Sequence, residues 1–211
     1  MDNIEQLVVT LSKDAAALKP AAHPLRMGLR WIAAAVAYLL IALLISGMRP
    51  DWMQQLHKPW FIIEIVSLFG ILISTAFSAA ILSFPDLHRH RRSAFIPAWV
   101  FALFVVVMGF SWFADEPPAP LPLHSFHCTL SILLLSLLPS VGIFYAMRQF
   151  ASTHLRLAGV VAVLFAFSTG ALWLRLHEQT DSIIHLVEWH YVPMIAVAVS
   201  GWWLGKRLLH W

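Results

Sequence analysis

The sequence predicts an all-α polytopic membrane protein with six transmembrane helices and both termini in the cytoplasm. Three observations lead to this fold class. Of the 211 residues, 60% are hydrophobic and 12% are charged, about half the charged fraction of an ordinary soluble domain. The mean hydropathy is +0.75, so a soluble fold would lack polar side chains for its surface. Six apolar runs are long enough to cross a bilayer, and basic residues gather on one side of them.

Each of the six runs supplies roughly the 20 residues that one crossing needs. We expect the spans at 29–48, 60–84, 95–114, 124–147, 157–175 and 183–204. Charged or proline-containing breaks separate them, such as Arg49-Pro50-Asp51 after the first span and Pro85-Asp86 after the second. The chain is therefore expected to divide into an N-terminal cytoplasmic segment, 1–28, and a six-helix transmembrane domain, 29–211.

The orientation follows from the basic residues, which are enriched in cytoplasmic loops. With both termini inside, eleven of the fourteen lysines and arginines fall in cytoplasmic segments. The outer segments hold only Arg49, Lys58 and Arg175 and are otherwise rich in acidic residues. The basic run 88–92 is interpreted as part of this signal and as a contact for lipid phosphates, rather than as a nucleic-acid site.

Before the first span, the apolar residues Ile4, Leu7, Val8 and Leu11 recur at helical spacing and form one stripe. A helix this short is marginal alone in water, so it needs a surface on which to lie. The membrane surface, the rest of the protein and a soluble partner are all open. The polar face carries more acidic than basic residues, which disfavours anionic lipid and favours a protein partner.

A second group of polar residues belongs to the outer side. Its members are imidazoles, carboxylates and the single cysteine: His124, His127, Cys128, His177, Glu178, Asp181, His185 and His190. Such groups are ligands for zinc, copper or iron, and thiolate with imidazole favours zinc or copper. We expect Asp181, His185 and Glu188 to share one helical face. The alternative is a set of interfacial residues that bond to loop backbone and lipid headgroups.

Glu64 is the one carboxylate inside the first five expected spans. It lies about 6 Å from the start of that span, at 1.5 Å per residue. We expect it to reach toward the outer interface rather than face the bundle interior, where it would join the histidines. No motif of an enzyme is found, and the protein is not expected to be one.

Short motifs then follow one another along almost the whole chain: Ile4 to Val8, Gly47 to Asp51, Ser83 to Pro85, Cys128 with Pro139, Leu176-His177, Asp181-Ser182, Trp189-His190, Pro193 and Gly205 to Trp211. Their order and spacing resemble the NrsF-type membrane anti-sigma factors, negative regulators of extracytoplasmic-function sigma factors. This resemblance implies a bacterial inner-membrane protein that sequesters such a sigma factor. It also implies that Ile4, Leu7, Val8 and Leu11 contact the sigma factor, as a helix in a groove.

The resemblance further implies release on an outer metal, redox or envelope-stress signal, but one position departs from the family pattern. A second cysteine commonly follows the histidine of the last outer loop, and here Glu178 stands there. With one cysteine, the chain cannot form an internal disulfide. A metal site, an intermolecular disulfide and a lost sensing function all remain open.

Two other functions are open. The first alternative is a small metal-handling membrane protein or transporter that uses the outer histidines and Glu64. Beyond Glu64 the spans lack the ionisable residues that a conducting path should contain. The second is a structural membrane subunit, which would leave the amphipathic N-terminus unexplained.

Overall fold

The computed structural model describes residues 2–15, 23–85, 92–112 and 125–210, and these residues form helices and no β-strand. Four spans are single helices: α2 (Pro24–Ser46), α4 (Pro59–Leu82), α7 (Ser125–Arg148) and α8 (Leu155–His177). The third span, Arg92–Phe110, has a turn at Phe95 and continues as α6 (Ile96–Trp112). The sixth is continuous through α9 (Ile183–His185), the π-helix η1 (Leu186–Tyr191) and α10 (Val192–Leu208). Six helices are long and apolar enough to cross a membrane, which confirms the predicted all-α fold with six spans.

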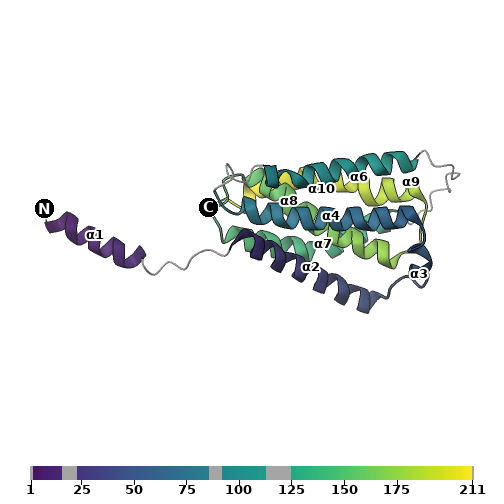
Figure 1. The fold of residues 1–211 in the computed structure, drawn as a ribbon, viewed down its shortest axis with the longest axis horizontal. Coiled ribbons are helices and arrows are strands. Elements are labelled where there is room, and N and C mark those ends of the chain that lie inside the picture. The colour runs from purple at the N-terminus through teal and green to yellow at the C-terminus, as the bar shows by residue number, and fades with distance from the viewer. Residues whose placement is uncertain (1, 16–22, 86–91, 113–124, 211) are drawn as a thin grey trace.

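The spans lie side by side in one bundle, and both ends of the chain lie toward the same end of it (Figure 1). We call this the terminal end, where α2, α6 and α8 begin and α4, α7 and α10 end. The opposite end is the distal end, where the short α3 (Trp52–Gln55) joins α2 to α4.

Helix α8 forms the centre of the bundle. Every residue from Ala158 to Leu172 is buried except Val160, and α8 packs against α2, α4, α7 and α10. Its contact with α10 is backbone to backbone, because a Cβ added at Gly201 would lie 2.7 Å from the carbonyl oxygen of Gly159. Small residues allow such close approach, as expected for glycines within spans.

The helix ends differ from the sequence expectation where local capping decides them. α2 begins at Pro24, five residues before Leu29, because proline suits the first turn and the His23 side chain accepts a hydrogen bond from the Leu25 N–H. α2 ends at Ser46, since Gly47 adopts a φ of +85° that ends the helix. The short α3 was not predicted.

Helix α1 (Asp2–Ala15) stands apart from the bundle on the side of its terminal end (Figure 1). The apolar stripe predicted from sequence is exposed. The exposed fractions are 70% for Ile4, 58% for Leu7, 59% for Val8 and 58% for Leu11. The stripe therefore covers no part of the bundle in this structure.

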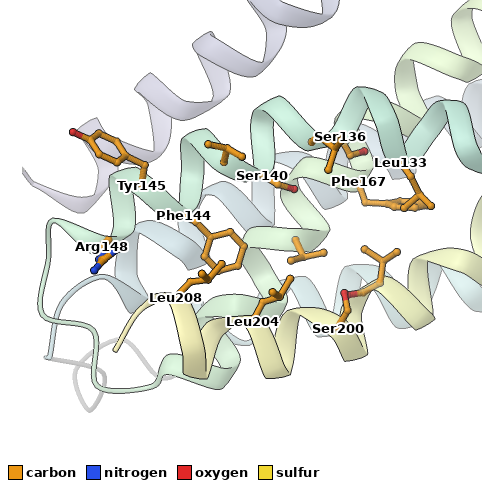
Figure 2. Close-up of a pocket in the computed structure, with 14 residues that line it drawn as sticks. Leu133, Ser136, Ser140, Phe144, Tyr145, Arg148, Phe167, Ser200, Leu204 and Leu208 are labelled. Atoms are coloured by element: carbon orange, nitrogen blue, oxygen red, sulfur yellow. The ribbon is translucent and has the colours of Figure 1, made fainter. Parts of the chain in front are cut away.

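A groove of about 650 Å³ opens between α7 and α10 above α8 (Figure 2). Leucine, valine and phenylalanine side chains form most of its wall, with Ser136, Ser140 and Ser200 among them. Among the described residues, Arg148, near the terminal end, is the one charged residue that lines it. The groove therefore offers an apolar surface and no group of titratable side chains.

Candidate functional site

The distal end holds a network of charged side chains centred on two buried arginines. Arg49 donates to both oxygens of Asp51, from Nε at 2.8 Å and from Nη2 at 2.9 Å, and it contacts Asp181 at 3.2 and 3.3 Å. Arg175 donates to Asp181 Oδ1 at 3.0 Å and to Glu64 Oε2 at 2.7 Å. The network therefore joins the first distal loop, α4, the end of α8 and the start of the sixth span.

Three further residues complete this network. Gln55 donates to both Asp51 and Asp181 at 2.8 Å, and Lys58 contacts Asp181 at 3.3 Å. The guanidinium carbons of Arg49 and Arg175 lie 5.6 and 4.8 Å from the centroid of the Phe61 ring. Lys58, Arg49 and Arg175 balance the charges of Asp51, Asp181 and Glu64, so the buried charges are compensated.

The pKa values of the loop residues reflect these contacts. Hydrogen bonds from Arg49 and Gln55 hold the pKa of Asp51 well below its usual value, and the bond to Asp51 raises the pKa of Arg49. Burial alone would raise the pKa of Asp181, but the hydrogen bonds from Arg49 and Arg175 outweigh it and lower that pKa. Both aspartates are therefore held as carboxylates.

The expectation that Glu64 reaches toward the outer interface is wrong. Glu64 is 3% exposed, faces the interior, pairs with Arg175 and accepts a hydrogen bond from the Tyr191 hydroxyl. The outward position would leave Arg175 buried without this counter-charge, which is costly. Glu64 does not join the histidines.

A second cluster lies beside the network, at the same end. Donor atoms of Cys128, Glu178, His185 and His190 all lie within 4.8 Å of one another. The Cys128 thiol donates to Glu178 Oε1 at 3.3 Å, and His190 Nε2 lies 3.6 Å from Glu178 Oε2. These four residues, which we call the CEHH cluster, come from the start of α7, the end of α8 and the sixth span.

The π-helix η1 places the two histidines of the CEHH cluster. In an α-helix, side chains five residues apart point about 140° away from each other. The i→i+5 bonding of a π-helix brings residue i+5 back over residue i. The rings of His185 and His190 accordingly meet edge to face, with centroids 5.2 Å apart. The Thr129 hydroxyl donates to the Trp189 carbonyl at 2.5 Å and ties this turn to α7.

Other residues singled out from the sequence lie elsewhere. His177 donates to the Gly47 carbonyl at 2.8 Å and stacks on Trp173, while His127 is exposed. His124 lies outside the described residues. Asp181 precedes the helix that begins at Ile183 and belongs to the arginine network, so it does not share a helical face with His185 and Glu188, as had been expected.

Sequence reasoning missed the arginine network, although a signal for it was present. The three basic residues assigned to outer segments are Arg49, Lys58 and Arg175, and each forms an ion pair here. Basic residues that occur against the charge bias, in loops rich in carboxylates, indicate such pairing. A cavity of about 210 Å³ adjoins the network and is lined by Gln55, Lys58, Glu64, Arg175 and Asp181, together with apolar residues.

Comparison with known proteins gives the family. The model of a family described as negative regulator of sigma F matches residues 11–211. The chain is 28% identical to the anti-sigma-F factor NrsF of Caulobacter vibrioides (strain NA1000 / CB15N), over 98% of this chain and 99% of that protein. It is 27% identical, with the same coverage, to the probable anti-sigma-F factor NrsF of Azospira oryzae (strain ATCC BAA-33 / DSM 13638 / PS). No solved structure matches.

The family role is regulatory, and its partner is a sigma factor. The match covers all six spans, the arginine network and the CEHH cluster, and it begins at Leu11 within α1. The chain therefore belongs to the NrsF family of negative regulators of sigma F.

Proposed function

We propose that this protein is an inner-membrane anti-sigma factor that sequesters an extracytoplasmic-function sigma factor through α1. The observation that carries the proposal is the exposed stripe of Ile4, Leu7, Val8 and Leu11 on a helix that stands apart from the bundle. An apolar helix face in solvent is typical of a surface that a partner covers.

The spacing of these residues suits a helix bound in a groove. Positions i, i+3, i+4 and i+7 anchor such helices in apolar grooves. Each anchor is more than half exposed before binding, so each contributes on the order of 1 kcal/mol when a sigma factor buries it. Ordering α1 on the partner offsets part of this energy.

The charge distribution supports a cytoplasmic terminal end. Basic residues near that end of the spans are Arg26, Arg30, Arg92, Arg148, Arg156, Lys206 and Arg207. The three basic residues near the distal end pair with carboxylates there. Basic residues are thus concentrated at the terminal end, as expected for a cytoplasmic face. This orientation presents α1 to cytoplasmic sigma factors.

We propose that release follows a metal, redox or envelope-stress signal at the distal end. A signal can shift sigma binding only if it acts differently on two arrangements of the bundle. α8 is suited to transmit it, because it contacts α2, α4, α7 and α10 and ends beside the CEHH cluster. The transporter alternative gains no support, because the described acidic, basic and histidine residues of the spans lie toward the two ends of the bundle.

The test is co-purification from native membranes, comparing the full chain with a chain that lacks residues 2–18. Bound proteins are identified by mass spectrometry before and after stress. We expect an extracytoplasmic-function sigma factor with the full chain in unstressed cells and none with the truncated chain. A sigma factor that binds both chains equally would contradict the role of α1.

A further inference from the structure

We propose that the CEHH cluster, formed by Cys128, Glu178, His185 and His190, binds one zinc ion. The binding itself is independent of the sigma factor. Only its regulatory consequence rests on the proposed function.

The distances between donor atoms fit a single ion. Tetrahedral zinc with bonds of about 2.0 to 2.3 Å holds its ligand atoms about 3.3 to 3.7 Å apart. The Cys128 Sγ to Glu178 Oε1 distance is 3.3 Å, and the His190 Nε2 to Glu178 Oε2 distance is 3.6 Å. No pair of donor atoms in the cluster is separated by more than 4.8 Å. Small side-chain rotations therefore bring four donors around one ion.

Unsatisfied atoms inside the cluster point independently to a ligand. His190 is 1% exposed, and neither of its ring nitrogens has a hydrogen-bond partner among the described residues. Glu178 Oε2 is also buried and, within the same part of the chain, accepts no hydrogen bond. Buried polar atoms left unpaired are destabilising, because they lose their hydrogen bonds to water without replacement. A cation between His190 Nε2 and Glu178 Oε2 would satisfy one atom of each residue.

The donor set favours zinc. One sulfur, two imidazole nitrogens and one carboxylate oxygen suit a borderline-soft tetrahedral ion, whereas calcium and magnesium take oxygen ligands. The Cys128 thiol releases its proton to solvent when the sulfur binds the metal. The Glu178 side chain is 25% exposed, which gives the ion a path from the distal surface.

A neighbouring contact orients the carboxylate. The Thr180 hydroxyl donates to Glu178 Oε1 at 3.0 Å, and the Thr180 carbonyl accepts from Arg175 at 3.0 Å. Glu178 is thus linked through Thr180 to the arginine that also holds Glu64 and Asp181. An ion in the CEHH cluster would draw α7, the end of α8 and the sixth span together at the distal end. Zinc would therefore favour one arrangement of the bundle and change sigma-factor capture.

The experiment titrates zinc into the purified full chain in detergent, after a chelator has removed bound metal. Metal is counted by mass spectrometry, and affinity is measured against a chromophoric chelator. Cobalt(II) is then used as a probe, because a thiolate ligand gives it a charge-transfer band. We expect one zinc per chain and a cobalt–thiolate band. Cys128→Ser should abolish the band, and His190→Gln should weaken zinc binding more than about 100-fold.

Two histidine variants serve as controls. His57→Gln removes an exposed distal histidine, and His127→Gln removes the exposed histidine next to Cys128. Both should keep the stoichiometry and affinity of the unchanged chain. Thermal unfolding and gel filtration of the metal-free variants verify that each is folded. The inference is overturned if a folded Cys128→Ser or His190→Gln chain binds zinc normally, or if the unchanged chain binds none.

Sigma capture is measured on the same preparations with and without zinc. If the chain captures the sigma factor but binds no zinc, only this inference fails. If the chain binds zinc but captures no sigma factor, only the proposed function fails. Capture that does not respond to bound zinc removes the regulatory consequence and leaves the metal site.

Discussion

Arg175 and Glu64 form a buried ion pair in which Nε lies 2.7 Å from Oε2 and the side chains are 4% and 5% exposed. The pair joins α8 to α4 within the apolar part of the bundle, and Arg175 also reaches Asp181. A charge there without its partner destabilises the fold, because the apolar surroundings do not solvate it as water would. The pair thereby fixes how the end of α8 sits against its neighbours.

Loss of one partner of this pair should be strongly destabilising. We expect Arg175→Met to lower the free energy of unfolding by about 3 to 5 kcal/mol, since Glu64 remains buried and uncompensated. Adding Glu64→Gln should recover part of this loss. Lys58→Met is the matched control, because Lys58 contacts Asp181 at 3.3 Å but is 57% exposed, so its loss should cost less than about 1 kcal/mol. Thermal unfolding in detergent measures all four chains.

Acid should weaken the distal end in a defined direction. The arginine network lowers the pKa of Asp51 and of Asp181 below the usual value of about 3.9, so their contribution to stability is present above that pH. The contribution is lost as the pH falls below about 4 and the carboxylates take up protons. The melting temperature should therefore begin to drop near pH 5 and fall progressively as the pH is lowered through and below about 4.

The variant Asp51→Asn separates this effect from general acid sensitivity. It should be less stable than the unchanged chain at pH 7 and should lose less stability on acidification, since it has no carboxylate to protonate there. Glu5→Gln, on exposed α1, should follow the unchanged chain at every pH. Parallel acid curves for Asp51→Asn and the unchanged chain would contradict the assigned role of Asp51.

The contact between α8 and α10 should not tolerate a single added methyl group. An added Cβ at Gly201 meets the Gly159 carbonyl oxygen at 2.7 Å and the Val160 Cα at 3.0 Å, both of them backbone atoms. We expect Gly201→Ala to cost about 1 to 3 kcal/mol. Gly142→Ala in α7 is the control, because a Cβ there meets nothing within 4 Å. Equal melting temperatures for the two variants would contradict the close packing.

The six spans could be predicted because apolar length decides membrane crossing, and that property is local. The short α3 and the early start of α2 were missed, since loop contacts and the Pro24 cap determine them. The arginine network does not follow from the charge bias, because that pattern assigns Arg49 and Arg175 to one side of the membrane but does not show which carboxylates neutralise them. Glu64 was placed wrongly for the same reason.

The sequence named all four residues of the CEHH cluster as candidates, together with others that lie elsewhere. Spacing alone does not separate them, since His177 turns toward Gly47 while Glu178, the next residue, faces Cys128. The α-helical period also grouped His185 with Asp181 and Glu188, whereas the structure brings it against His190. The π-helix, whose Trp189 carbonyl bonds to Thr129 in a different span, sets the facing of His185 and His190.

The central claim is that the apolar stripe of α1 holds the sigma factor. Leu7→Asp with Leu11→Asp places two charges on that stripe. Gln6→Asp with Thr10→Asp adds the same charge outside the stripe and is the matched control. The measurement is the amount of sigma factor that co-purifies with each full-length variant from unstressed membranes, normalised to the protein recovered. The account predicts loss of the sigma factor with the leucine variant and normal binding with the control, whereas normal binding by the leucine variant would contradict it.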